Sequence, residues 1–133
     1  MATYITVAFL AGRIAVGLFF LDAAYKHIFK SAGLVGYAQS KGIKPGTAKF
    51  AVISTGILAL IGGLSVLLGY RPHYGIACLV IFLLGVSFKM HDYWKETDPM
   101  AKMNSRVGFW KNIALLGALL CMLAIAQPWV WSL

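Results

Sequence analysis

Four long apolar runs divide the chain, and shorter polar segments separate them. The runs cover residues 4–25, 50–70, 74–91 and 107–127. Within each run the hydrophobic residues follow one another without the strict alternation of a membrane strand. A helix needs about 20 apolar residues to cross the hydrocarbon core of a bilayer. The pattern therefore predicts an all-α membrane protein, a bundle of four transmembrane helices that forms one domain over residues 1–133.

The connections between the runs differ in length and polarity. The first is long and rich in glycine, and within it residues 34–39 are expected to form a short interfacial helix ahead of the sequence KGIKPG. The second is a tight turn that ends at Pro72, a residue suited to the first turn of a helix. The third, DYWKETDPMAKMNSR, is strongly polar, and Asp98 followed by Pro99 predicts a turn or a helix start.

Composition supports a membrane location. Of the 133 residues 60% are hydrophobic and only 12% are charged, whereas soluble domains have about 25% charged residues. The net charge of +8 comes from basic residues in the connections, which indicates anionic lipid headgroups as partners rather than nucleic acid. Cys78 and Cys121 lie inside apolar runs and are expected to be small buried side chains, not a redox pair.

The distribution of basic residues predicts an orientation. Ten of the twelve lie in or beside the first and third connections: Lys26, Lys30, Lys41, Lys44, Lys49, Lys89, Lys95, Lys102, Arg106 and Lys111. Cytoplasmic connections of membrane proteins carry an excess of Lys and Arg. We therefore expect both connections in the cytoplasm and both termini outside, in a multi-pass protein of the cell inner (plasma) membrane.

Arg13 is the most unusual residue of the first run. It lies nine residues after Tyr4, or about 13 Å along a helix, and an arginine near the bilayer centre costs about 3 kcal/mol or more. The middle parts of the other runs hold no carboxylate. We therefore expect Arg13 to face the bundle interior and to contact polar groups of the second and fourth runs. Three roles remain open: a packing residue bonded to carbonyls, a contact to a quinone oxygen or anionic headgroup, or a partner for an acid of another subunit.

A second polar group is expected where the runs meet the basic connections. Lys26, His91, Lys111 and Asn112 come from three different helices and should converge near the inner leaflet, as a candidate ligand-binding cavity. His91 could relay a proton or bind a ligand, because histidine titrates near neutral pH, or it could be an interfacial hydrogen-bonding residue. Asp22 lies four residues before Lys26, a spacing that predicts an ion pair on one helix face.

Known arrangements of catalytic and metal-binding residues are not apparent. His27 and His73 are expected at opposite interfaces, so the sequence predicts no metal site. We find neither a nucleophile with its base nor a pair of acids, so we assign no catalytic residue and expect no self-contained catalytic activity.

Several short motifs occur in order along the runs. They are Arg13, Gly17 and Phe20 followed by Lys26; Gly62 and Gly63 followed by Leu68 and Gly69; His91 followed by Trp94; and Phe109 followed by 111–115, KNIAL. In this order and at these helix positions they resemble the DoxX family of small four-helix membrane proteins. The chain differs from many members at Ala59, where a glutamate is common, and at Ala23 and Ala24, where a glycine is frequent.

The resemblance implies a quinone-linked or redox-linked role, since the family is related to the small subunits of thiosulfate:quinone oxidoreductase. The first expectation is an accessory or structural subunit of a larger membrane complex, respiratory or redox in kind. One alternative is a quinone-interacting oxidoreductase subunit, and another is a small transporter or lipid-handling protein. No cofactor is expected, although quinone or lipid could be a ligand, and the expected partners are membrane lipids and other membrane subunits.

Overall fold

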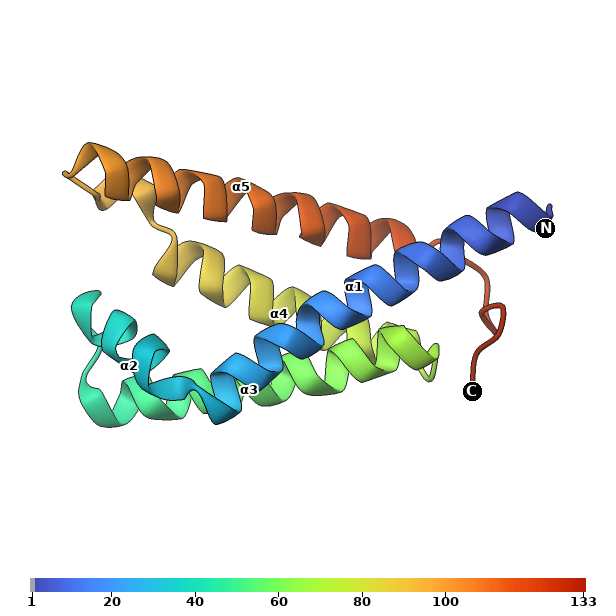
Figure 1. Cartoon of the computed structure of the whole chain (residues 1–133), viewed down its shortest axis with the longest axis horizontal. Helices are drawn as coiled ribbons and strands as arrows, with labels where there is room; N and C mark the ends of the chain where they lie inside the picture. Colours follow the sequence, from blue (N-terminus) through green and yellow to red (C-terminus); the bar gives the residue numbers. More distant parts are fainter. Residues whose placement is uncertain (1) are drawn as a thin grey trace.

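A computed structural model describes residues 2–133, and Figure 1 shows a bundle of long helices with a short helix at one end. Within those residues there is no strand, which confirms the all-α prediction. The elements in chain order are α1 (Thr3–Phe29), α2 (Ser31–Ser40), α3 (Pro45–Leu68), α4 (Pro72–Met90), the 3₁₀ helix η1 (Tyr93–Lys95) and α5 (Pro99–Met122). The predicted interfacial segment becomes α2, which packs against α3.

Local sequence signals fix several helix ends. α3, α4 and α5 each begin at a proline, which lacks the N–H that a first helical position leaves unpaired. Asp98 caps α5, because its carboxylate accepts a hydrogen bond from the Ala101 N–H at 2.9 Å. Gly69 ends α3 in the left-handed region, with φ 71°, where only glycine is free of strain.

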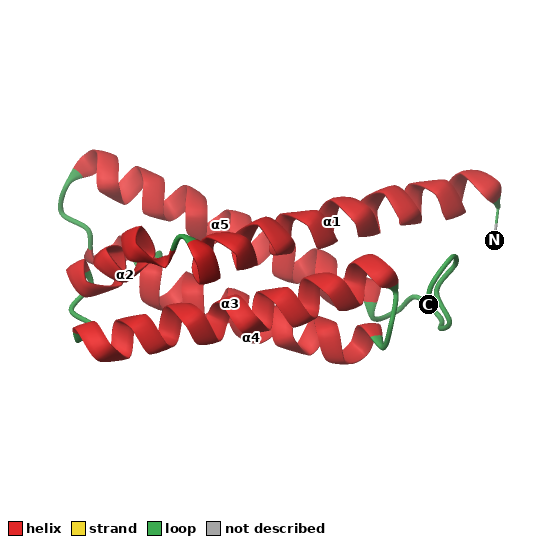
Figure 2. Ribbon diagram, turned by 60° about the horizontal axis from the view of Figure 1, so that its bottom comes forward, coloured by secondary structure: helices red, strands yellow, loops and turns green. Residues whose placement is uncertain are grey.

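Three helical segments are long and apolar enough to cross a membrane, and a fourth span is not confirmed. The three are α1, α3 and the segment Pro72–Lys95, which contains α4. α5 differs because its first half carries basic residues and its helix ends at Met122, ahead of the expected end at residue 127. Turns and an irregular tail follow it (Figure 2).

Close contacts at glycines set the register between α1 and α3. A Cβ added at Gly17 would lie 2.7 Å from the Cβ of Leu67, and one added at Gly56 would lie 2.7 Å from the Cβ of His27. Leu67 is next to the last residue of α3, so the first turns of α1 have no part of α3 beside them. Figures 1 and 2 show this segment of α1 extending past the other helices.

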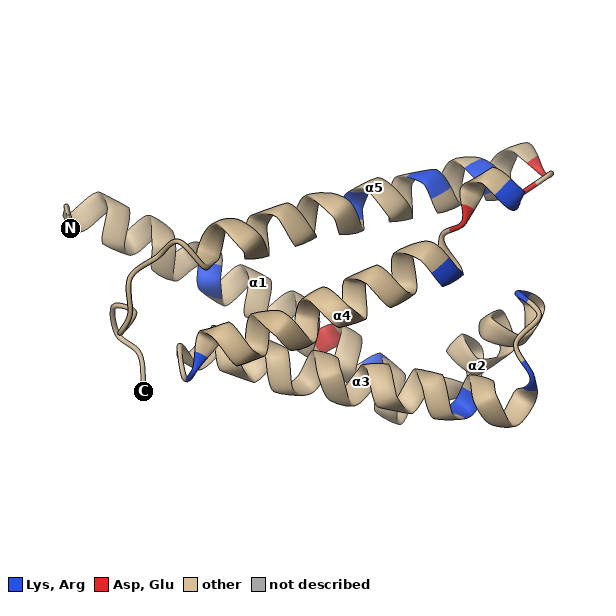
Figure 3. Ribbon diagram, turned by 180° about the vertical axis from the view of Figure 1, so that it is seen from behind, with Lys and Arg blue, Asp and Glu red and all other residues tan. Residues whose placement is uncertain are grey.

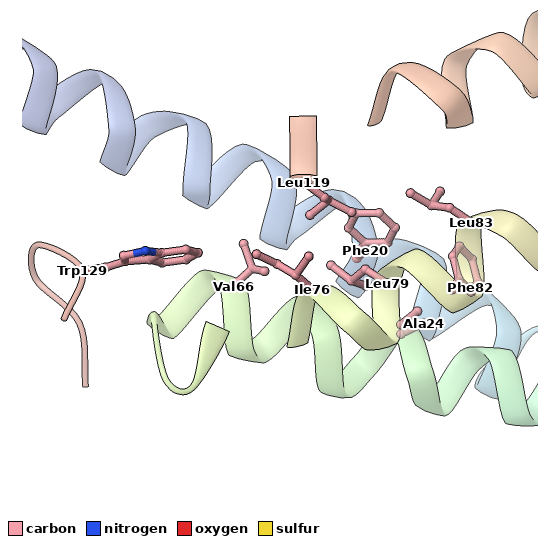
Figure 4. Packing of buried hydrophobic residues seen from close by; sticks show 10 residues of the cluster. Phe20, Ala24, Val66, Ile76, Leu79, Phe82, Leu83, Leu119 and Trp129 are labelled. Carbon is pink, nitrogen blue, oxygen red and sulfur yellow. The ribbon is translucent and has the colours of Figure 1, made fainter. Parts of the chain in front are cut away.

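A hydrophobic core joins the long helices and the tail (Figure 4). Phe20 is fully buried and packs edge-on against Phe82 of α4, with ring centroids 5.9 Å apart. Trp129 of the tail is also buried and packs edge-on against Phe9 of α1 at 5.1 Å. The tail is therefore part of the folded structure.

Charged residues gather at one end of the molecule (Figure 3). We call the end where α2 meets α3 and α4 meets α5 the basic end, and the opposite end, which holds both termini, the terminal end (Figures 1 and 3). Both basic connections lie at the same end, as the sequence predicts. The side of the membrane that each end faces stays a prediction.

Candidate functional site

His91 lies at the basic end, immediately after α4, and its ring packs on α5. A Cβ added at Gly108 would lie only 2.6 Å from the His91 Nδ1, so the ring occupies the place that a side chain would fill. This Nδ1 is buried and has no hydrogen-bond partner within residues 2–133. A buried N–H without an acceptor costs about 1–3 kcal/mol. Nδ1 bonds to no described group, and Nε2 is therefore the ring nitrogen left to bond a ligand, as a donor or an acceptor according to the tautomer.

A polar cavity of about 430 Å³ opens beside His91. It is lined by Tyr37, Ser40, Lys41, His91, Glu96, Ala101, Asn104 and Ser105. Lys41 donates to Asp92 at 2.8 Å and also to Glu96, and this group ties the end of α2 to the segment after α4. Burial lowers the pKa of Lys41, but the two carboxylates outweigh burial and raise that pKa above its ordinary 10.5. Lys41 is therefore charged at neutral pH.

A second cavity of about 360 Å³ lies between α1, α2, α3 and α4, and we call it the apolar cavity. Its lining residues are His27, Leu34, Tyr37, Ala38, Ile43, Ala51, Val52, Thr55, Gly85, Val86, Lys89, Met90 and His91. Tyr37 and His91 line both cavities. Most side chains around the apolar cavity are hydrocarbon, so the two histidines and Tyr37 are prominent polar groups in it.

The polar groups of the apolar cavity have defined hydrogen-bonding roles. The His27 Nδ1–H donates to the Ala23 carbonyl at 2.7 Å, so the neutral ring keeps Nε2 as an acceptor. The Tyr37 hydroxyl donates to the Met90 carbonyl at 3.0 Å. The cavity thus combines a ring nitrogen that accepts, the Nε2 of His27, with the ring of His91, whose Nε2 can donate in one tautomer.

Arg13 lies at the terminal end, far from the position expected for it. It is buried, as predicted, but its Nη1 is 3.0 Å from the place of a Cβ on Gly69, which follows the last residue of α3. Arg13 is level with the end of α3, because the first turns of α1 lie beyond that end. Arg13 bonds to carbonyls, one of the three expected roles, but they belong to the tail and not to the second and fourth runs: Nη1 donates to the Val130 carbonyl at 2.9 Å and Nη2 to the Trp131 carbonyl at 2.8 Å. Nε is buried without a partner in residues 2–133.

The structure only partly assembles the expected group at the basic end. Asn112 is buried on α5, one turn after Gly108 and its contact with His91. Lys111 is exposed and lies over the ring of Phe19, with Nζ 5.7 Å from the centroid. Lys26 is exposed on α1. That Lys26 lies together with His91 and Asn112 stays a prediction.

Lys26 forms the predicted ion pair with Asp22 at 2.6 Å, but the pair is not buried. The two side chains are 58% and 61% exposed. Asp22 follows Leu21, which contacts Gly63, and Lys26 precedes His27, which contacts Gly56. The ion pair is therefore level with the middle of α3, where charged groups on a helix cost about 2.5–3.5 kcal/mol each.

Some residues of the site were missed by reasoning from the sequence alone. His27 was expected at an interface, but the contact of its Cβ with Gly56 places it beside the middle of α3. Tyr37 lay in the segment expected to be interfacial. Its aromatic side chain was the sequence feature that could have indicated a place in the site. Lys41 was counted only as a loop charge, because nothing in the sequence joins it to Asp92, 51 residues away. Within residues 2–133 no group of three or more His, Cys, Asp or Glu is placed to hold a metal ion.

Helical segments with these lengths and apolar surfaces define a small integral membrane protein. The DoxX family model matches residues 8–92, well over half of the chain, so the protein belongs to the DoxX family. The match covers α2, α3, α4 and most of α1, and it ends before α5. No curated protein and no solved structure matches the chain.

Proposed function

We propose that this protein is an accessory subunit of a membrane redox complex and that it holds a quinone-class ligand in the apolar cavity. The observation that carries the proposal is the pairing of His27 and His91 on one mostly hydrocarbon-lined cavity. A volume of about 360 Å³ is in the range of small-molecule sites, which combine apolar walls with a few placed polar groups.

The chemistry of a quinone fits these polar groups. A quinone ring presents carbonyl oxygens that accept hydrogen bonds, and the reduced ring presents hydroxyls that donate them. The His91 Nε2–H can donate to the oxidised ring, and the His27 Nε2 can accept from the reduced ring. In this proposal a neighbouring subunit supplies and removes the electrons, and this chain binds and orients the ring.

Photolabelling tests the ligand. Purified protein in lipid nanodiscs is irradiated with a photoreactive quinone analogue, and the labelled peptides are identified by mass spectrometry. Label should concentrate on peptides of α2 and the end of α4, and excess unlabelled quinone should remove it. His91→Ala should reduce labelling at least fivefold, whereas His73→Ala, at the terminal end, should not change it. Equal labelling of the two variants, or competition by phospholipid but not by quinone, would refute the quinone site.

A companion variant tests the donor role of His91 without removing its ring. Gly108→Ala places a methyl group 2.6 Å from the His91 Nδ1, so the ring must move. We expect labelling to fall while the variant still inserts. Gly117→Ala is the matched control on the same helix, because nothing lies within 4 Å of its added Cβ.

The accessory role is tested separately from the ligand. The protein is extracted from native membranes in a mild detergent, and subunits that comigrate with it on a native gel are identified. We expect a redox-active membrane subunit in the comigrating band. Migration of the protein without any redox subunit would contradict the accessory role and would leave the ligand site standing.

We also propose that the basic end faces the cytoplasm and the termini face outward, which the concentration of Lys and Arg at one end supports. In a background with Cys78 and Cys121 replaced by alanine, a cysteine at Ser132 should react with a membrane-impermeant thiol reagent in intact cells. A cysteine at Lys44 should react only after the membrane is permeabilised. The reverse pattern would contradict the orientation.

A further inference from the structure

One exposed face of α1 combines a charged pair with a line of small residues. Asp22 and Lys26 lie on this face, and Ala8 and Ala15 precede Asp22 by fourteen and seven residues. Residues seven apart lie on one side of a helix. All these side chains are exposed, and a Cβ at the adjacent Gly12 would meet nothing within 4 Å.

Lipid is a poor cover for this face. The Asp22–Lys26 pair is level with the middle of α3, so in a bilayer spanned by α3 it would face hydrocarbon. Small residues let a second helix approach closely, and charged groups inside a membrane are usually paired within protein. The face therefore calls for a partner helix with small residues and with opposite charges at the same depth.

We propose that the partner is a second copy of this chain, packed through α1 around a two-fold axis along the membrane normal. Two copies inserted in the same orientation have parallel α1 helices, and the two-fold axis brings each residue level with its equivalent. Asp22 and Lys26 are separated by about 6 Å along the helix, so each lysine can reach the carboxylates of both copies.

The four side chains then form a ring of alternating charge, in which each carboxylate contacts two ammonium groups. A different partner would need its own acid and base at this depth, whereas a second copy provides both in register. Ala8, Ala11 and Ala15 allow the two helices to approach closely on the N-terminal side of the charged pair. The proposal concerns a surface separate from the apolar cavity and stands independently of the quinone.

Cysteine cross-linking tests the proximity. In the background with Cys78 and Cys121 replaced by alanine, Ala15→Cys should form a disulfide-linked dimer on mild oxidation of purified protein in nanodiscs. Ile81→Cys, an exposed site on α4, is the control and should stay monomeric. Absence of the Ala15→Cys dimer, with the thiol still reactive toward maleimide, would overturn the proposal, as would equal dimer formation at both sites.

Charge reversal tests the ring itself. Asp22→Lys and Lys26→Asp each place four like charges together, so each should reduce capture of an untagged copy by a tagged copy at least tenfold. The double variant Asp22→Lys/Lys26→Asp restores alternation and should recover capture to near the wild-type level. Circular dichroism and monodisperse elution confirm that each variant is folded. Undiminished capture in folded single variants, or no recovery in the folded double variant, would overturn the proposal, and so would cross-linking of Ala15→Cys in native membranes only to a different protein.

Discussion

The two ends of the bundle each bury a cation, and they compensate it differently. At the basic end Lys41 lies between two carboxylates, those of Asp92 and Glu96. At the terminal end Arg13 is 2% exposed and donates to two backbone carbonyls, with its Nε unpaired within residues 2–133. Carboxylates neutralise the cation at one end, whereas only dipoles face it at the other.

The difference shows what each cation does for the fold. The Lys41 group joins the connection after α2 to the connection after α4, so loss of the lysine leaves two acids close together. Arg13 holds the irregular tail onto α1, and the Leu133 N–H adds a bond to the Leu68 carbonyl at 3.0 Å. Removal of Arg13 frees the tail but also removes a costly buried charge. The basic end should therefore depend on its cation more than the terminal end does.

The largest expected effect is that of Lys41→Met. The change leaves two partly buried carboxylates without their cation, and breaking such a group costs about 3 kcal/mol. We expect a clear loss of stability in denaturant titration of protein in detergent, monitored by circular dichroism. The control is Lys44→Met, an exposed lysine three residues later, which should change stability by less than about 0.5 kcal/mol. Equal stability of the two variants would show that the two carboxylates are not paired with Lys41.

Glycine substitutions sharpen the comparison between the ends. Gly42 at the basic end and Gly69 at the terminal end both have positive φ, 84° and 71°, so alanine strains each by about 1 kcal/mol. A Cβ at Gly42 meets nothing within 4 Å, whereas one at Gly69 lies 2.6 Å from the Ser132 Cβ and 3.0 Å from Arg13 Nη1. Gly69→Ala should therefore cost about 2 kcal/mol and Gly42→Ala about 1 kcal/mol.

The same two variants also test whether the tail is held against Gly69. Limited proteolysis followed by mass spectrometry should show faster cleavage after Gln127 in Gly69→Ala than in Gly42→Ala. Equal cleavage rates would mean that the tail is not held against Gly69.

Much of the fold follows from the sequence, and the register of α1 explains much of the rest. Apolar runs place α1, α3 and α4 to within about five residues, and Pro72 indicates the start of α4, because both signals are local. Depth is not local: Arg13 is nine residues from Tyr4, but its position depends on the contacts of Gly17 and Gly56 with residues far along the chain. A shift of α1 along α3 therefore moved Arg13 to the terminal end and Lys26 to the middle.

The candidate site was less predictable for a related reason. His91 was identified because a histidine at the end of an apolar run is conspicuous, and the structure places it on both cavities. Its companions His27 and Tyr37 become part of the site because α1 ends beside the middle of α3 and α2 then packs against α3. Lys41 could not be assigned to the site from the sequence, because helical periodicity does not indicate its contact with Asp92.

A smaller effect concerns the dependence of stability on pH, to which Lys41 contributes. The pKa of Lys41 is raised in the folded state, so its stabilising contribution is complete below the unfolded value of about 10.5 and is lost as pH rises toward the folded value. Stability of the wild type should therefore fall above pH 10.5, by at most about 1.4 kcal/mol per pH unit from this group.

Lys41→Arg isolates that contribution, because arginine stays protonated in this range. The decline between pH 10 and 11 should be shallower in the variant than in the wild type. Parallel curves would mean that other groups account for the decline.

The smallest expected effect is that of Arg13→Leu. The change removes two hydrogen bonds to carbonyls, at about 1 kcal/mol each or somewhat more for a charged donor, and it removes the cost of burying a guanidinium that no acid neutralises. These contributions oppose each other, so the stability of the helices should change by less than about 1 kcal/mol. Proteolysis of the tail should nevertheless increase, because the Val130 and Trp131 carbonyls lose their donors. A loss of 3 kcal/mol or more would place Arg13 in the same class as Lys41, and it would indicate an anionic acceptor for its unpaired Nε.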